Sequence, residues 1–209
     1  MQSCMAKTLL LARRGRPADP EARAERRAQI LQAAHRCFLR KGFHAATTAE
    51  ISAEAEISVA GLYQYFSSKE DLILALIELD LAENIALIKQ LSKGDDFFVA
   101  AEQVAREMAN MPFYHSLAKL RLEIMAEACR SPAVAEMMAS AEQRSMAALV
   151  QAATLAQTRG QIAADVDPYE FALALNCLSD GLMGRVCLPS FARGPFVSAC
   201  LNLLRRAGA

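Results

Sequence analysis

The chain has 209 residues, 54% of them hydrophobic, which suits one large or two small globular domains with a sizeable core. Lys and Arg together number 23, as do Asp and Glu, so the net charge is zero. No apolar stretch reaches membrane-spanning length without a charge or a helix breaker, so we expect no membrane partner. The charge is unevenly placed: residues 1–46 hold 10 basic and 3 acidic residues, whereas residues 47–209 hold 13 and 20. This asymmetry favours a front end that meets a polyanion, or a basic terminus that only aids solubility.

Residues 1–19 are predicted to form a flexible basic arm. The arm carries three cations interleaved with glycine and proline, which disfavour a helix: Arg13, Arg14, Gly15, Arg16 and Pro17. The apolar run at residues 9–12 is too short for an export signal, and no small-residue cleavage site precedes the arginines. We therefore expect a cytoplasmic protein.

Every segment after the arm has helical rather than alternating periodicity, so we expect an all-α fold. The first helix is predicted from about Pro20 to Gly42, with an apolar face of Ile30, Ala34, Cys37 and Phe38. The capping box Thr47-x-x-Glu50 predicts a short second helix that buries Ile51 and Ala55.

Two further capping signals place the next helices. Ser58 begins a third helix, in which Leu62 and Phe66 are the buried pair, and Ser67 or Ser68 begins a long fourth helix that ends at Gly94. Three short helices over residues 20–66, the last two joined by a tight turn, indicate a helix-turn-helix, which is a DNA-binding arrangement.

Five more helices are predicted beyond Gly94. Their expected bounds are Asp95 or Asp96 to Met111, Phe113 to Arg130, Ser131 to Gly160, Asp167 to a point before Pro189, and Pro195 to Arg206. We therefore expect a helix-turn-helix domain at residues 20–73 and a larger helical domain at residues 74–209.

Residues 47–73 carry the most specific pattern in the chain. Their sequence, TTAEISAEAEISVAGLYQYFSSKEDLI, resembles the DNA-binding region of the tetracycline-repressor (TetR) family of transcriptional regulators. The family's positions in register are Thr47, Thr48, Ile51, Ala55, Ser58, Leu62, Tyr63, Phe66, Ser68, Lys69, Glu70 and Leu72. The resemblance covers residues 25–73, and beyond them only the helix lengths agree.

The resemblance implies a set of contacts with the DNA backbone. Thr47 and Thr48 lie at a helix N-terminus, where hydroxyl and free N–H groups can hold a phosphate oxygen, although capping alone would also explain them. Tyr63 and Tyr65 can each pack a ring and reach a phosphate with the hydroxyl, and one of them could be purely structural. Lys69 opposes the dipole of the helix that it begins, a cost that a nearby phosphate would offset.

Reading of the bases is expected from the outer face of the third helix, at Val59, Ala60, Gly61 and Gln64. Gln64 can pair bidentately with an adenine edge, and the apolar residues can contact thymine methyls. Two positions depart from the family pattern: Glu56 replaces the turn glycine, and Val59 replaces a residue that is often polar. We expect a strained backbone at Glu56 and fewer base contacts, with the fold retained.

The basic arm is expected to contact DNA beside the helix-turn-helix. Arg13, Arg14 and Arg16 suit a narrow minor groove rich in A·T pairs, or the flanking phosphates. A basic tail with no part in specificity is the alternative.

We expect neither an enzyme nor a cofactor or metal site. Walker, dinucleotide-binding, zinc-protease and nucleophile-elbow motifs are missing from the sequence, and Ser116-x-x-Lys119 stands on a helix with no supporting motif. The three histidines do not have the spacing of metal ligands. The six cysteines fall mostly in apolar contexts and are interpreted as small buried hydrophobes in a reducing compartment, with a redox sensor as the alternative.

The larger half is expected to bind a small-molecule effector, because methionine and phenylalanine gather there and helix bundles form cavities between helices. An ordinary helical core would use most of the same residues. The predicted lining residues are Met108, Met111, Phe113, Met125, Asn176 and Met183, with His115, Glu123 and Asp180 as polar anchors.

The last two helices, near residues 168–187 and 195–206, have broad apolar coverage. It is provided by Phe171, Leu175, Leu178, Leu182, Phe196, Val197, Leu201 and Leu204. We expect these helices to pair with the same two helices of a second chain, which would present two recognition helices about 34–36 Å apart to a palindromic operator.

The sequence therefore predicts a ligand-responsive repressor that an effector releases from its operator. Two rival hypotheses are a helical small-molecule carrier or enzyme with a vestigial helix-turn-helix, and a non-specific DNA binder driven by the arginine arm.

Overall fold

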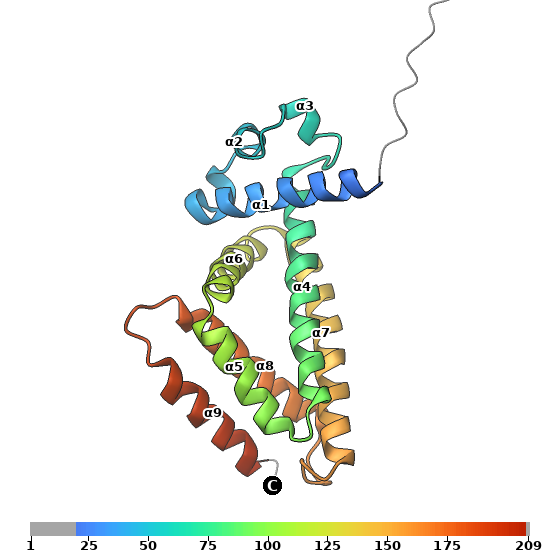
Figure 1. The fold of residues 1–209 in the computed structure, drawn as a ribbon, viewed down its shortest axis with the longest axis vertical. Coiled ribbons are helices and arrows are strands. Elements are labelled where there is room, and N and C mark those ends of the chain that lie inside the picture. Colours follow the sequence, from blue (N-terminus) through green and yellow to red (C-terminus); the bar gives the residue numbers. More distant parts are fainter. Residues whose placement is uncertain (1–19, 208–209) are drawn as a thin grey trace, which may run out of the picture.

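The computed structural model describes residues 20–207, which form nine helices and contain no strand (Figure 1). The predicted all-α fold is confirmed. The arm with Arg13, Arg14 and Arg16 lies outside the described residues. Within the described part of the chain, no helix is both long and apolar enough to cross a membrane.

The first helix, α1 (Pro20–Ala45), has 26 residues. It is therefore longer than the short helix that the sequence predicted. It crosses the end of α4 (Lys69–Lys93), and α2 (Thr48–Glu54) and α3 (Val59–Leu62) pack beyond it (Figure 1). The predicted stop at Gly42 is where α1 kinks, because Gly42 has a φ of 74°. Its missing Cβ would lie 3.2 Å from a carboxylate oxygen of Glu123.

Side-chain caps define where the helices of this region begin. The Thr47 hydroxyl accepts from the Glu50 N–H at 3.2 Å, while the Glu50 carboxylate accepts from the Thr47 N–H at 3.1 Å. The predicted capping box is therefore confirmed. The Ser58 hydroxyl caps α3, and Ser68, of the two serines predicted, caps α4.

The long helix α4 is shared by two hydrophobic cores. Its first half buries Leu72, Ile73 and Leu76 against α1–α3, and its second half buries Leu87, Ile88 and Leu91 in the core of the larger half. Leu120, Ile124 and Val134, from the larger half, complete the core beneath α1–α3. The predicted domain boundary at residue 73 falls inside α4, so a division into 20–73 and 74–209 stays a prediction.

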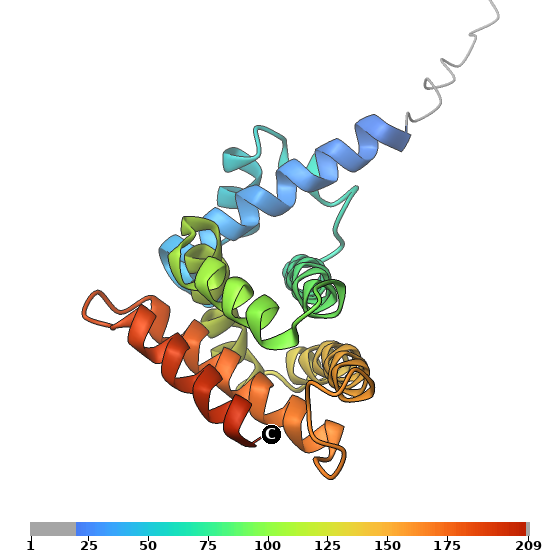
Figure 2. The same cartoon turned by 60° about the horizontal axis from the view of Figure 1, so that its bottom comes forward.

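Five helices follow α4. They are α5 (Phe97–Asn110), α6 (Pro112–Ala128), α7 (Pro132–Thr158), α8 (Pro168–Val186) and α9 (Arg193–Ala207). α7 packs along α4, whereas α9 lies beside α5 and α8 (Figures 1 and 2). α6 lies between this layer and α1, so it touches both halves of the molecule.

The cysteines are less buried than predicted. Of the five that the structure describes, Cys37 is buried, Cys187 and Cys200 are half-buried, and Cys129 and Cys177 are exposed. The expected burial is wrong for Cys129, which is the C-cap residue of α6, and for Cys177, which lies on the exposed side of α8.

Glu56 occupies a backbone conformation that normally calls for glycine. Its φ is 55°, and no other described non-glycine residue has a positive φ. The N–H of Glu56 bonds the carbonyl of Ala53 at 3.1 Å, and the N–H of Ile57 bonds that of Ser52 at 3.0 Å. These two bonds form a Schellman motif, which ends α2 and aims α3. The left-handed backbone anticipated at this position is therefore present.

We expect Glu56→Gly to raise the free energy of unfolding by about 0.5–1 kcal/mol. Relief of the left-handed strain gives about 1–2 kcal/mol, and the greater entropy of glycine in the unfolded chain takes part of it back. Urea unfolding at a fixed protein concentration measures the difference. Glu56→Ala is the control, because it removes the same carboxylate and keeps the strain. Equal stability of both variants would contradict the assignment of strain.

Candidate nucleic-acid interface and ligand cavities

The predicted base-reading residues lie on an exposed surface at the end of the molecule farthest from α9 (Figure 1). Val59 is 40% exposed and Ala60 is exposed, whereas Gly61 is half-buried. α3 ends at Leu62, so Gln64 stands in a turn closed by the bond from its N–H to the Gly61 carbonyl. The Gln64 side chain is exposed and available to a groove.

Two arginines of α1 hold this turn in place, and the sequence interpretation did not include them. Arg23 donates to the Gln64 carbonyl at 3.2 Å, and its guanidinium lies 4.9 Å from the centre of the Tyr65 ring. Arg27 stacks on the Phe66 ring at the same distance. Both arginines are exposed, so they add positive charge to the face that carries Gln64. The three arginines within residues 23–27 were the feature of the sequence that could have indicated this contact.

The four predicted phosphate contacts other than Lys69 are all at least partly exposed. Thr47 and Tyr63 are exposed, whereas Thr48 and Tyr65 are half-buried. Thr47 already uses its hydroxyl to cap α2, and Tyr65 uses its ring to support Arg23. Thr47 and Thr48 stand at the N-terminus of α2, as predicted.

Lys69 has a structural partner that the sequence did not reveal. Its ammonium donates to the carbonyls of Phe43, His44 and Ala46 at 2.8, 3.3 and 3.2 Å, and lies 4.4 Å from the centre of the Phe43 ring. These contacts satisfy the carbonyls at the end of α1 and engage all three ammonium donors. The unfavourable place of Lys69 at the start of α4 is thus offset within the protein.

Ion pairs fix α2 against α1. Arg36 and Arg40 bind the two oxygens of the Glu54 carboxylate at 2.7 and 2.8 Å. The hydrogen bond from Arg40, and then that from Arg36, lower the pKa of Glu54. Lys41 pairs with Glu50 in the same way. The orientation of α2, and of α3 after it, therefore depends on charges of α1.

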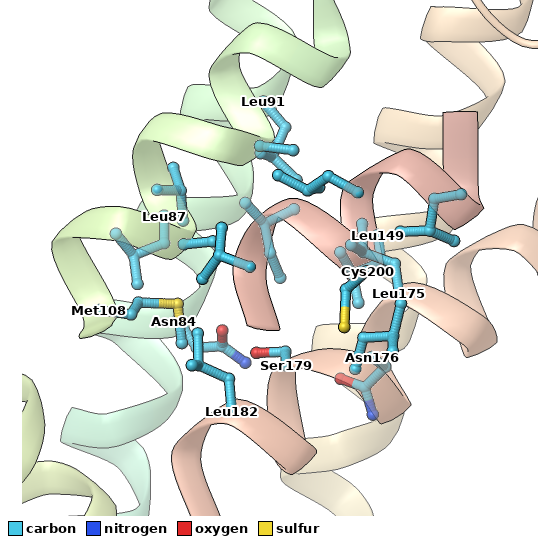
Figure 3. Close-up of a pocket in the computed structure, with 18 of the residues that line it drawn as sticks. Asn84, Leu87, Leu91, Met108, Leu149, Leu175, Asn176, Ser179, Leu182 and Cys200 are labelled. Atoms are coloured by element: carbon cyan, nitrogen blue, oxygen red, sulfur yellow. The ribbon is translucent and has the colours of Figure 1, made fainter. Parts of the chain in front are cut away.

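An apolar cavity of about 90 Å³ lies between α4, α5, α7, α8 and α9. Two of the predicted lining residues, Met108 and Asn176, do line it. Figure 3 shows the polar ends of Asn84, Ser179 and Asn176 on one side of the cavity and Leu87 and Leu91 on the other.

A second, polar cavity of about 120 Å³ adjoins the first and shares Asn84 and Asn176 with it. The predicted residues Met125 and Asp180 line it. Arg121 stands between Asp80 and Asp180, with nitrogen–oxygen distances of 3.5 and 3.6 Å. Burial raises the pKa of Asp80 and of Asp180. Asp80, Asn84 and Arg121 were missed, because they come from helices far apart in the sequence and only the tertiary fold brings them to one cavity.

The other five predicted lining residues lie away from both cavities. Met111 and Phe113 are exposed, with the Phe113 ring packed on Tyr114. His115 bonds the Ala109 carbonyl, Glu123 faces Gly42, and Met183 is buried in the main core. A role of these five residues in ligand binding stays a prediction from composition. Among residues 20–207, no group of His, Cys, Asp and Glu side chains could hold a metal ion.

The apolar residues predicted to cover α8 and α9 mostly face the protein's own core. Five of them are buried there: Phe171, Leu182, Val197, Leu201 and Leu204. Leu175, Leu178 and Phe196 are half-buried against the same core. The large apolar side chains left exposed on these helices are Tyr169, Leu173 and Leu203.

Both parts of the chain match known protein families. Residues 30–76 match the model described as bacterial regulatory proteins, tetR family, and residues 100–207 match that of the BetI-type transcriptional repressor, C-terminal. The transcriptional regulator UidR of Escherichia coli strain K12 is 30% identical over 167 residues, which cover 80% of this chain and 84% of UidR.

Solved structures share the arrangement of helices. Salmonella enterica GusR superimposes with a TM-score of 0.78 at 28% identity, over 88% of this chain and 95% of GusR. FadR of Bacillus subtilis, solved in complex with stearoyl-CoA, has the same fold at 17% identity, with a TM-score of 0.72 over 86% of this chain and 98% of FadR. With the matched models on both halves and the exposed helix-turn-helix, the chain belongs to the TetR family of bacterial transcriptional regulators and is a DNA-binding regulator, not an enzyme.

Proposed function

We propose that the protein is a cytoplasmic repressor that binds a palindromic operator and leaves it when a small molecule binds in the larger half. The observation that carries the proposal is the exposed turn with Gln64, which Arg23 and Arg27 brace from α1. A braced turn loses little conformational entropy on docking, so its contacts can contribute fully to affinity.

In this proposal α3 and the turn after it enter the major groove. Base contacts come from Val59, Ala60, Gly61 and Gln64, with Gln64 as the hydrogen-bonding reader. Phosphate contacts come from Thr47, Thr48, Tyr63 and Tyr65, and from Lys69 where it can leave a carbonyl of α1. The arm with Arg13, Arg14 and Arg16 follows the adjacent minor groove.

We assign the link between the cavities and the DNA to α6. One face of α6 places Arg121 in the polar cavity. Farther along, its Glu127 is 5% exposed, and Glu127 Oε2 lies 2.8 Å from His44 Nε2 at the end of α1 and 3.2 Å from Arg130. Separating α6 from α1 would remove His44 from this buried carboxylate, which is costly, so a shift of α6 would move α1 with it. An effector that prefers the shifted state would change the spacing of the two recognition helices in the dimer.

Pairing of two chains is proposed through α8 and α9, the outermost helices of the larger half (Figure 2). Tyr169, Leu173 and Leu203 are exposed on them, at 55%, 43% and 65%. These are the most exposed large apolar side chains of the two helices, and Leu175, Leu178 and Phe196 of the predicted set are also partly accessible to a partner.

Gln64→Ala is expected to weaken binding to the operator by about 1–3 kcal/mol, or roughly 5- to 150-fold, since it removes a bidentate base contact. The operator is first captured from genomic fragments at about 150 mM salt, where non-specific binding is weak. The affinity of each variant for that fragment is then titrated. Gln151→Ala, an exposed glutamine on α7, is the matched control and keeps the affinity of the parent.

Two outcomes of the capture would contradict this function. Diffuse enrichment that is identical in the parent and in Gln64→Ala would favour the non-specific DNA binder. No enrichment at all, with small-molecule binding intact, would favour the carrier with a vestigial helix-turn-helix.

Leu203→Glu is expected to convert the dimer to a monomer at micromolar concentration, because it places a charge in the apolar contact of α9. Sedimentation equilibrium reports the change, and affinity for the palindrome falls in parallel. Leu79→Glu, an exposed leucine on α4, is the control and leaves the dimer intact. A parent chain that sediments as a monomer, or a Leu203→Glu variant that remains a dimer, would contradict the interface.

A further inference from the structure

The polar cavity holds more negative than positive charge. Asp80, Glu142 and Asp180 line it with three carboxylates, and Arg121 supplies one guanidinium. The distances from Arg121 to Asp80 and Asp180, 3.5 and 3.6 Å, exceed those of a charge-assisted hydrogen bond, which are about 2.7–2.9 Å. The single cation is therefore shared between two carboxylates and binds neither closely.

Burial makes the negative charge unfavourable at Asp80, whereas Asp180 is half-exposed and Glu142 is exposed. The Asp80 side chain is only 21% exposed, and its desolvation is the main reason why its pKa is raised. Asn84, which could donate to a carboxylate, instead donates to the Ser145 hydroxyl at 2.8 Å. A second cation in the cavity would reduce the excess of carboxylates over cations from two to one and replace part of the lost solvation.

The apolar cavity next to it limits the size of the apolar part of a bound ligand. Asn84 and Asn176 line both cavities, and their polar ends lie on one side of the apolar cavity (Figure 3). The volumes, about 90 and 120 Å³, are near that of an engineered cavity of roughly 150 Å³ that binds benzene. The apolar part that fits is thus the size of one ring or a short alkyl chain.

We propose that the effector is a small amphiphilic cation, with its ammonium group among Asp80, Asp180 and Glu142 and its apolar part in the adjoining cavity. The inference rests on the proposed function only in calling the ligand an effector, because binding of the cation to the cavity does not require DNA. The ammonium competes with Arg121 for the two aspartates. Arg121 joins α6 to α4 and α8, so the competition loosens the hold on α6.

Three probes with the same ring and nearly the same chain but different charge test this class: 2-phenylethylammonium, 2-phenylethanol and 3-phenylpropanoate. Binding to the full chain is measured by titration calorimetry at pH 7. The ammonium is expected to bind at least 10-fold more tightly than the alcohol, and the carboxylate more weakly than both. An alcohol that binds as well as the ammonium, or a preferred carboxylate, overturns the proposal.

Asp180→Asn is expected to weaken binding of the ammonium about 10-fold and to leave binding of the alcohol unchanged. Asp165→Asn, an exposed aspartate before α8, is the matched control and changes neither. Thermal melting verifies that each variant is folded, and Glu142→Gln, at an exposed position of the same cavity, repeats the test if Asp180→Asn does not fold. Equal loss for both probes, or no loss for either, overturns the assignment of the aspartates.

Failure of this inference is distinguishable from failure of the proposed function, because operator capture uses the chain without ligand. Captured operator with no binding of the ammonium overturns the cationic class and leaves the repressor standing. Binding of the ammonium that depends on Asp180, without any captured operator, supports the site and overturns the repressor.

Discussion

The structure depends on one constraint: α4 is a single continuous helix whose two halves are buried in two different cores. Leu72 and Leu76 pack beneath α1–α3, whereas Leu87 and Leu91 pack in the larger half. A close-packed helix transmits displacement rather than absorbing it. The DNA-reading surface therefore has no independent position, and its orientation follows from how α5 and α7 pack on α4. Leu120 and Ile124 of α6 strengthen this dependence, because they complete the core under α1.

Charged side chains then fix the parts that the cores leave free. α3 has four residues and buries Leu62, which is too little to hold a helix in water. Its place is defined by its neighbours: Arg36 and Arg40 hold α2, Lys69 holds the end of α1, and Arg23 holds the turn at Gln64. Most of these pairs are exposed and individually weak. They act together as geometric restraints, so the reading surface is ordered by several contacts that each contribute little to stability.

The sequence predicted local features well and non-local ones poorly. Capping depends on residues within one turn, so Thr47, Ser58 and Gly94 marked helix ends correctly, and the strain at Glu56 followed from one missing glycine. Arg121 meets Asp80 and Asp180 across three helices, and no periodicity encodes that meeting. Composition likewise could not separate Met108, which lines a cavity, from Met183, which fills the core. Apolar residues on α8 and α9 gave no sign of whether they faced the chain itself or a partner.

α6 contacts both the polar cavity and α1, so it is suited to transmit a displacement from the cavity to the DNA-reading surface. Toward the larger half it contributes Arg121, which is held by long, shared ion pairs. Toward α1 it contributes Glu127, nearly inaccessible to solvent and bound at short range by His44 and Arg130. The first contact is long and shared between two carboxylates, so a competing cation can weaken it. The second joins a desolvated carboxylate to His44 of α1 at 2.8 Å, and separating the two helices would remove that partner. A perturbation that loosens α6 at the cavity would therefore leave it attached to α1, and α1 would follow the helix instead of releasing it.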